Sequence, residues 1–184
     1  MKKLFSLILF IGFISTAHAQ FGARAGLNSS NFSDTNFSNK QGFHLGAYYR
    51  IQLGVIDIEP GLQYSKKGYK GTEDISGIEV NERLNYIDVP VLVRFNLLEA
   101  VNIFGGPQAS VLASRKYELG STTSSSTDVI RGYDIGAVLG VGINLPLGFN
   151  VQASYDLGLT SLNYLNTDVK NRVFKVSLGI DILK

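Results

Sequence analysis

Apolar and polar residues alternate along most of the chain after its first twenty residues. Between Phe43 and Leu53 every second residue is apolar, and the residues between them are polar or glycine. A period of two predicts a β-strand whose two faces meet different surroundings. The pattern returns about eight times and predicts strands at 20–29, 41–53, 56–66, 83–95, 101–114, 129–145, 149–160 and 173–183.

The connections between these segments alternate in length. Three are short turns, at 54–55, 96–100 and 146–148, and four are long, at 30–40, 67–82, 115–128 and 161–172. Up-and-down barrels that cross an outer membrane have short periplasmic turns and long outer loops. We therefore predict an all-β fold, an eight-stranded antiparallel up-and-down transmembrane β-barrel.

Aromatic residues provide a separate test, because they collect at both membrane interfaces of such barrels. The predicted topology places Phe21, Phe95 and Phe149 at the inner ends of strands, and Phe43, Tyr64, Tyr133 and Phe174 at the outer ends. Aromatic residues also favour strands in general, which is the alternative explanation.

The N-terminus is typical of an export signal. Lys2 and Lys3 precede an apolar run from Leu4 to Ile14, and small residues follow up to Ala19. The run is too short to span a bilayer as a helix, so a retained anchor helix is the weaker alternative. We expect residues 1–19 to be a signal peptide cleaved between Ala19 and Gln20, and residues 20–184 to form one outer-membrane β-barrel domain.

The second face of the alternation indicates which side is inside. In the last three segments it consists mainly of glycine and short uncharged polar residues. A sheet face in water would be about 25–35% charged, whereas small polar groups suit the filled interior of an eight-stranded barrel. We expect a structural charge network in this interior, made by Arg24, Arg50, Asp57, Glu59, Asp88, Arg94, Asp134, Asp156 and Lys175, with Asp181 on the same face.

One ion pair follows from the turn at Gly54 and Val55. If Leu53 opposes Ile56, Arg50 faces Glu59 on the inward side. Three prolines, Pro60, Pro90 and Pro107, fall inside predicted strands and remove ladder donors, so bulges or register shifts are expected there. The inward set around Pro90 includes Leu84, Tyr86 and Leu92, which is unusually apolar for a lumen.

Composition narrows the partners. Without the signal segment the chain has 15 basic and 15 acidic residues, so no basic excess suggests nucleic acid. The chain has no cysteine, which excludes disulfides and thiolate metal sites. We expect outer-membrane lipid as the surroundings, a monomer, no cofactor and no metal.

Candidate chemistry is sparse. His44 is the only histidine after the signal segment, and Ser110, Ser154 and Ser177 point inward, but catalysis needs nucleophile, base and orienter to converge. Asp57 and Glu59 lie two residues apart, as glycosidase or metal carboxylates can, but Arg50 opposite favours an ion pair. Asp34, Asn36 and Asn39 lack the spacing of a calcium loop. Gly140 and Gly142 are expected to make room for large inward side chains of a neighbouring strand.

Several short motifs occur in order along the chain. They are FGARAGLN from Phe21, GFHLG from Gly42, IEPGLQYSKKG from Ile58, LNYIDVPV from Leu84, GGP from Gly105 and GVG from Gly140. With this order and spacing the chain resembles the PorT-like outer-membrane β-barrel domain family. The resemblance implies an outer-membrane barrel, with some relatives linked to protein secretion, and brings no catalytic or ligand residues.

We therefore predict an integral protein of the cell outer membrane with a plugged polar interior. Its role would be structural or interactive through four mobile surface loops, with envelope or secretion proteins as candidate partners, and no enzymatic activity. One alternative is a soluble exported barrel of the lipocalin type that holds an apolar ligand. Another is an enzyme, for which loss of an activity in His44→Ala would be the minimum support.

Overall fold

The computed structural model of this chain describes residues 18–33, 38–72, 79–119, 122–127, 130–162 and 168–183. The long strands are β1 (His18–Phe32), β2 (Ser38–Gln52), β3 (Ile56–Thr72), β4 (Glu79–Asn96), β5 (Val101–Leu119), β7 (Tyr133–Asn144), β8 (Phe149–Gly158) and β9 (Asn171–Leu183). Two short elements complete the set, strand β6 (Thr122–Ser124) and the 3₁₀ turn Pro146–Gly148. Within the described ranges, no helix is long and apolar enough to cross a membrane.

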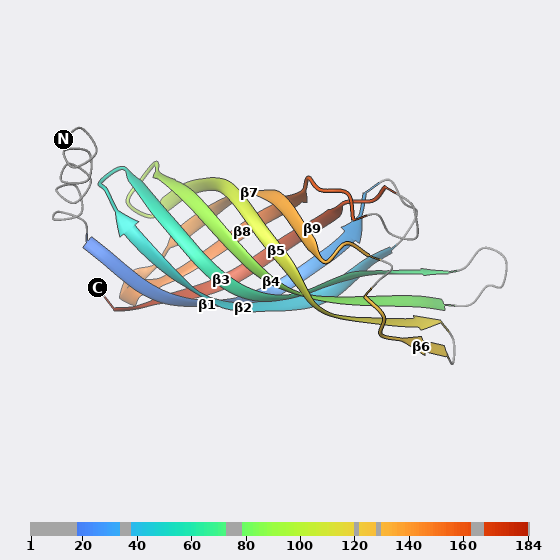
Figure 1. The fold of residues 1–184 in the computed structure, drawn as a ribbon. Coiled ribbons are helices and arrows are strands. Elements are labelled where there is room, and N and C mark those ends of the chain that lie inside the picture. The colour runs from blue at the N-terminus through green and yellow to red at the C-terminus, as the bar shows by residue number, and fades with distance from the viewer. Residues whose placement is uncertain are drawn as a thin grey trace, which may run out of the picture.

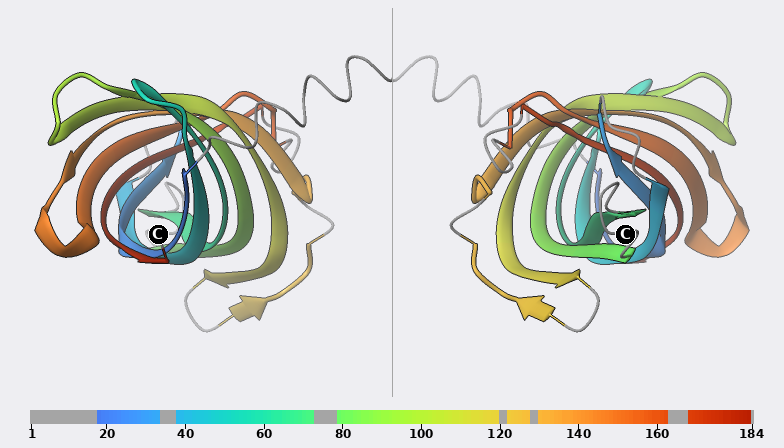
Figure 2. Two further views of the ribbon diagram at one scale, coloured as in Figure 1. Left: turned by 90° about the vertical axis from the view of Figure 1, so that its left-hand side faces the viewer. Right: turned by 90° about the vertical axis from the view of Figure 1, so that its right-hand side faces the viewer.

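The eight long strands form one closed antiparallel barrel. The order is β4-β3-β2-β1-β9-β8-β7-β5, and β5 pairs back with β4 to close the ring. Figure 1 shows the barrel from the side, and Figure 2 shows the closed ring nearly end-on. The predicted eight-stranded up-and-down topology is confirmed, and β6 is a short addition that pairs only with β5 among the described strands.

The two faces of each strand differ as the alternation predicted. In β7 the side chains of Asp134 and Val138 are buried, whereas Ile135, Leu139 and Val141 are exposed. The same alternation of buried polar and exposed apolar residues runs through β9. Leucine, isoleucine and valine therefore cover the outside of the barrel, and mainly polar side chains with a few apolar ones fill its axis, as expected of a lipid-embedded barrel.

Inward glycines provide the space that large inward side chains occupy. A Cβ added to Gly140 would lie 2.3 Å from the Phe104 ring, and one added to Gly22 would lie 2.3 Å from the Tyr48 ring. Gly140 pairs directly with Phe104 across β5 and β7, so the ring lies over bare backbone. The expected packing role of this strand glycine is confirmed.

The expected register shifts at the prolines are wrong. Pro60 and Pro107 pair in constant register with Val91 and Ala137, and the β4–β5 register is unbroken past Pro90. A residue of an antiparallel ladder donates its N–H toward one neighbour only, so a proline can lose one bond without an inserted residue. The shifts lie instead at Phe21/Gly22, Asn39/His44 and Asn85/Tyr86.

The outer ends of the strands extend further than predicted. Strand β3 continues to Thr72, β4 begins at Glu79, and β5 continues to Leu119. Most residues of the segments expected as loops, 67–82 and 115–128, are therefore in strands. Figure 1 shows these ends and β6 projecting beyond the rest of the barrel, opposite the end where the C-terminus lies. We call this projection, residues 66–72, 79–86, 112–119 and 122–124, the outer extension.

Parts of the remaining loops are packed, which corrects the expectation of four mobile loops. Ile130, Leu162 and Val169 are buried in a cluster with the inward side chains of Tyr69, Leu84 and Tyr86. The Arg131 amide donates to the Leu162 carbonyl at 2.8 Å, and the Ser33 amide donates to the Lys170 carbonyl at 2.8 Å. Two of the apolar inward residues of β4, Leu84 and Tyr86, thus belong to a small core at the outer mouth of the barrel.

The expected signal segment lies outside the described residues except for His18 and Ala19, which begin β1. Ala19 pairs with Ile51 and Gln20 pairs with Arg50. Asp34 and Asn36 of the first loop also lie outside the described residues, whereas Asn39 is exposed in β2.

Candidate functional site

The innermost layer of the lumen is an ion cluster around one carboxylate. Glu59 of β3 binds Arg24 of β1 at 2.9 Å, Arg50 of β2 at 2.9 Å and Arg94 of β4 at 2.8 Å. The predicted contact of Arg50 with Glu59 is present, and two further arginines from strands that flank this hairpin join it. Asp181 of β9 lies 3.5 Å from Arg50 and is the other carboxylate in contact.

Aromatic rings and amides hold the arginines of this cluster. The Arg24 guanidinium lies 4.2 Å from the centre of the Tyr48 ring, and that of Arg94 lies 4.3 Å from the centre of the Phe104 ring. Arg94 also donates to the side-chain oxygens of Asn102 at 2.9 Å and Gln152 at 2.6 Å. Cation–π contacts and hydrogen bonds therefore replace water around charges that one glutamate alone does not balance.

A second ion cluster lies further toward the outer side. Leu92, Phe104 and Val138 form an apolar layer above the first cluster. Four residues from Leu92 on β4, Asp88 binds Lys67 at 2.8 Å and Lys175 at 3.3 Å, and Lys175 also binds Asp156 at 2.7 Å. Alternating charged and apolar layers thus fill the barrel axis.

Two carboxylates expected in the charge network meet amides instead of cations. Asp57 accepts a hydrogen bond from Asn96 at 3.1 Å, and Asp134 accepts one from Asn171 at 2.9 Å. Within the described residues neither is in an ion pair, so the network is two separate clusters with hydrogen-bonded carboxylates at its rims.

The sequence interpretation missed the outermost charged members. Lys67 was placed in a loop, and the buried pair of Glu82 with Arg115, 2.5 Å apart, was not considered. The alternation of inward and outward positions along the two strands could have indicated these residues. Lys67 continues the odd-numbered inward positions of β3, and Glu82 continues the even-numbered ones of β4.

His44 lies in a hydrogen-bonded chain of three buried side chains. Its Nδ1 is 2.6 Å from Asn28 Oδ1, and its Nε2 is 2.8 Å from Ser177 Oγ. The order of serine, histidine and amide matches nucleophile, base and orienter. The sequence interpretation overlooked Asn28, although it falls at an inward position of the alternating pattern. A substrate also needs access and space, and His44, Ser177 and Asn28 are at most 3% exposed.

The cavity beside this chain is small. It is lined by His44, Gln108, Gln152, Lys175 and other inward residues, and its volume is about 10 Å³. A volume of this size corresponds to about one water molecule. No group of three His, Cys, Asp or Glu in the described ranges is arranged to hold a metal ion. The described inward residues form a packed core along the barrel axis.

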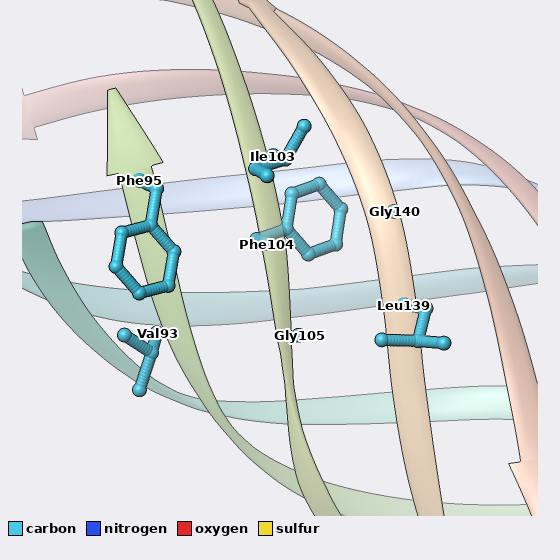
Figure 3. A pocket seen from close by; sticks show the side chains of 7 residues that line it. All are labelled: Val93, Phe95, Ile103, Phe104, Gly105, Leu139 and Gly140. Carbon is cyan, nitrogen blue, oxygen red and sulfur yellow. The ribbon is translucent and has the colours of Figure 1, made fainter. Parts of the chain in front are cut away.

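A larger hollow lies on the outside of the barrel. It has a volume of about 440 Å³ and is lined by residues of β4, β5 and β7. Figure 3 shows Val93 and Phe95 on one side, Leu139 on the other, and Ile103 and Gly105 on the strand between them. Its lining is apolar and continues the exposed apolar face of the barrel.

Comparison with known protein families identifies the family of this chain. Residues 14–164 match the family described as "Outer membrane protein beta-barrel domain". The chain belongs to this family. The closed barrel, its apolar outside and the family together make it an integral protein of the cell outer membrane, and they disfavour the soluble lipocalin-type alternative.

Solved structures show the same fold in other outer-membrane barrels. Neisserial surface protein A is 17% identical, with 90% of this chain and 99% of that chain covered and a TM-score of 0.61. Ail, the attachment invasion locus protein of Yersinia pestis, is 16% identical, with 89% and 98% covered and a TM-score of 0.54. A second Ail structure, in complex with the heparin analogue sucrose octasulfate, is 18% identical, with 89% and 98% covered and a TM-score of 0.55. No curated protein matches this sequence.

Proposed function

We propose that this outer-membrane barrel is a monomeric, non-enzymatic interaction protein that presents the outer extension to partners outside the cell. The filled lumen supports this proposal most directly. The cavity beside His44 holds only about 10 Å³ and the inward side chains around it are buried, which supports an interior that serves to hold the barrel rigid.

The outer extension is suited to present a surface. It continues the hydrogen-bonded ladders of the barrel, with Gly68 paired to Arg83 and Arg83 paired to Lys116. Its last strand, β6, pairs with β5 on one side only among the described strands. Edges of this kind accept an extended segment of another protein as an added strand.

The proposal also covers the subfamily of the protein, its partners, its signal peptide and the role of its lumen charges. The motifs of the sequence support a PorT-like member of the family, with envelope or secretion proteins of a Gram-negative cell as partners. Residues 1–19 act as a signal peptide cleaved between Ala19 and Gln20, which leaves β1 from Gln20 onward to pair with β2 and β9. Arg24, Arg50, Asp57, Glu59, Asp88, Arg94, Asp134, Asp156 and Lys175 serve structure, not chemistry.

Site-specific photo-crosslinking in intact cells tests the proposal. A crosslinker at exposed Thr123 of β6 is expected to trap a defined partner, whereas one at exposed Glu99 in the inner turn is not. Purified protein in planar bilayers is expected to show no discrete conductance. Stable channels in the wild type, or the same crosslinked species from both positions, would contradict the proposal.

A further inference from the structure

Four exposed cations share one face of the outer extension. Lys66 and Lys70 come from β3, Arg83 from β4 and Lys116 from β5, and all four are exposed. Arg83 lies directly opposite Lys116 in the β4–β5 ladder and opposite Gly68 in the β3–β4 ladder. Since Lys66 and Lys70 flank Gly68 at two residues on either side, the four side chains lie on one continuous face. We call these four residues the basic patch.

One acid lies among these cations in the described part of the extension. Glu118 binds Arg83 at 3.2 Å and Lys116 at 2.8 Å, and it also accepts a hydrogen bond from Asn81 at 2.9 Å. The hydrogen bond from Lys116 and the charges of Arg83 and Lys116 lower the pKa of Glu118. Among the described side chains, one carboxylate cannot neutralise four cations, so these five groups together carry a positive charge.

The positive charge of the basic patch affects the pKa of a neighbouring lysine, Lys40. Lys40 lies beyond the outer aromatic residues and contacts Asn81. Burial, together with the positive charges of Arg83 and Lys70, lowers the pKa of Lys40 to about 8. The positive charge of the patch therefore acts on Lys40 of the adjacent strand β2.

The basic patch begins at the membrane surface. Lys66 is two residues beyond Tyr64 on the outward face of β3, and its ammonium lies 4.8 Å from the centre of the Phe43 ring. Phe43 and Tyr64 are in contact, with ring centres 6.1 Å apart, at the level of the outer aromatic girdle. The ammonium of Lys66 is thus at the height of lipid head groups.

The other cations of the patch lie higher. From Tyr64 to Lys70 a strand rises about 20 Å along its length. A tilt of about 40° leaves roughly 15 Å of height. The head-group layer of a phospholipid bilayer is only about 5–8 Å deep on each side. Lys70, Arg83 and Lys116 therefore reach beyond phospholipid phosphates into the layer that the sugars of a glycolipid occupy.

The distribution of charge on the barrel is one-sided. Every exposed lysine or arginine in the described ranges lies beyond the outer girdle, namely Lys66, Lys70, Arg83, Lys116, Lys170 and Arg172. The described cations closer to the inner side, such as Arg24 and Arg94, point into the lumen. Glu99 is the exposed charge of the inner turns. The outside of the barrel is therefore positive only at its outer end.

We propose that the basic patch binds the phosphate groups of a phosphorylated glycolipid in the outer leaflet of the membrane. Arginine donates two parallel hydrogen bonds to a phosphate, and lysine supplies a mobile point charge. Lys66 is at the height of phosphates near the acyl chains, and Arg83 with Lys116 is at the height of phosphates on the sugars. The contact fixes the height and rotation of the barrel beneath the extension.

Binding of fluorescent lipopolysaccharide to the detergent-solubilised protein, measured by anisotropy, tests this inference. Each basic side chain near an anionic lipid surface contributes about a factor of five in affinity, so Arg83→Gln/Lys116→Gln is expected to bind roughly thirtyfold more weakly. The matched control is Lys170→Gln/Arg172→Gln, which removes equal charge beside β9, four strands from β4 in both directions. The control is expected to bind as the wild type does.

Further arms separate the sources of phosphate and guard against misfolding. Glu118→Gln removes the acid of the patch and is expected to strengthen binding. Lipopolysaccharide stripped of its phosphates is expected to bind weakly, and inorganic phosphate at equal concentration is expected not to compete. Equal losses in both double variants, binding of the stripped glycolipid at full strength, or tighter binding of a soluble sulfated glycan would overturn the inference.

Discussion

Glu59→Gln is expected to lower the free energy of unfolding by about 3–5 kcal/mol, the range measured when one partner of a buried ion pair is removed. Glu59 is 1% exposed and is the carboxylate in contact with both Arg24 and Arg94. Its neutral replacement leaves three guanidinium groups from three strands close together, with Asp181 near Arg50 alone. Water entering from the inner end would recover part of the cost, but like charges would still repel each other.

Urea unfolding in lipid vesicles, followed by the gel shift between folded and unfolded barrel, measures this change. Glu99→Gln, in an exposed turn, is the control and is expected to stay within about 0.5 kcal/mol of the wild type. Combining Glu59→Gln with Arg24→Gln is expected to lower the free energy of unfolding by less than the sum of the two single changes, because the double variant leaves less uncompensated charge buried than the two single variants together. Strict additivity would show that the cluster carries no coupling.

Leu139→Arg is expected to cost about 2–4 kcal/mol, because an arginine at the bilayer midplane must reach water or deform the lipid. Leu139 is 59% exposed and lies in the middle of β7, on the outward face. In water, an arginine at so exposed a position would cost little. The penalty therefore reports on lipid contact and not on packing within the protein.

Leu97 supplies a matched control for this change. It is also 59% exposed, but it lies in the turn between β4 and β5, at the inner end of the barrel. Leu97→Arg is expected to cost about 0–1 kcal/mol, the value near a membrane interface. Gln152→Asn in the lumen is also expected to cost less than Leu139→Arg, although it loosens the contact with Arg94. Similar costs at Leu139 and Leu97 would show that depth in a bilayer is irrelevant.

The membrane-spanning part of the fold was predictable because lipid and a packed axis impose opposite demands on neighbouring residues. In β7, Asp134 and Val138 point inward while Leu139 and Val141 point outward, and the sequence shows this directly. Beyond the membrane the outward face of a strand meets water and carries polar and charged residues, so apolar residues no longer mark the outward positions while the hydrogen-bonded ladder continues. The outer ends of β3, β4 and β5 were therefore missed.

The sequence predicted which residues point into the barrel better than it predicted which of them contact each other. Alternation places Glu59 and Arg50 inside, and the turn sets their register, so this pair could be foreseen. The convergence of Arg24 and Arg94 on the same carboxylate depends on how eight strands close, which no local pattern encodes. The burial of Leu162 and Val169 in the outer mouth also depends on loops folding back over the barrel.

The contact of Leu139 with acyl chains is the central claim, and fluorescence quenching tests it most directly. The chain has no tryptophan, so Leu139→Trp and Lys116→Trp each introduce a single reporter, one at the expected mid-depth and one on the outer extension. In vesicles of phosphatidylcholine brominated near the middle of its acyl chains, we expect strong quenching at position 139 and little at position 116. Equal quenching at both positions, or none at 139, would contradict the account.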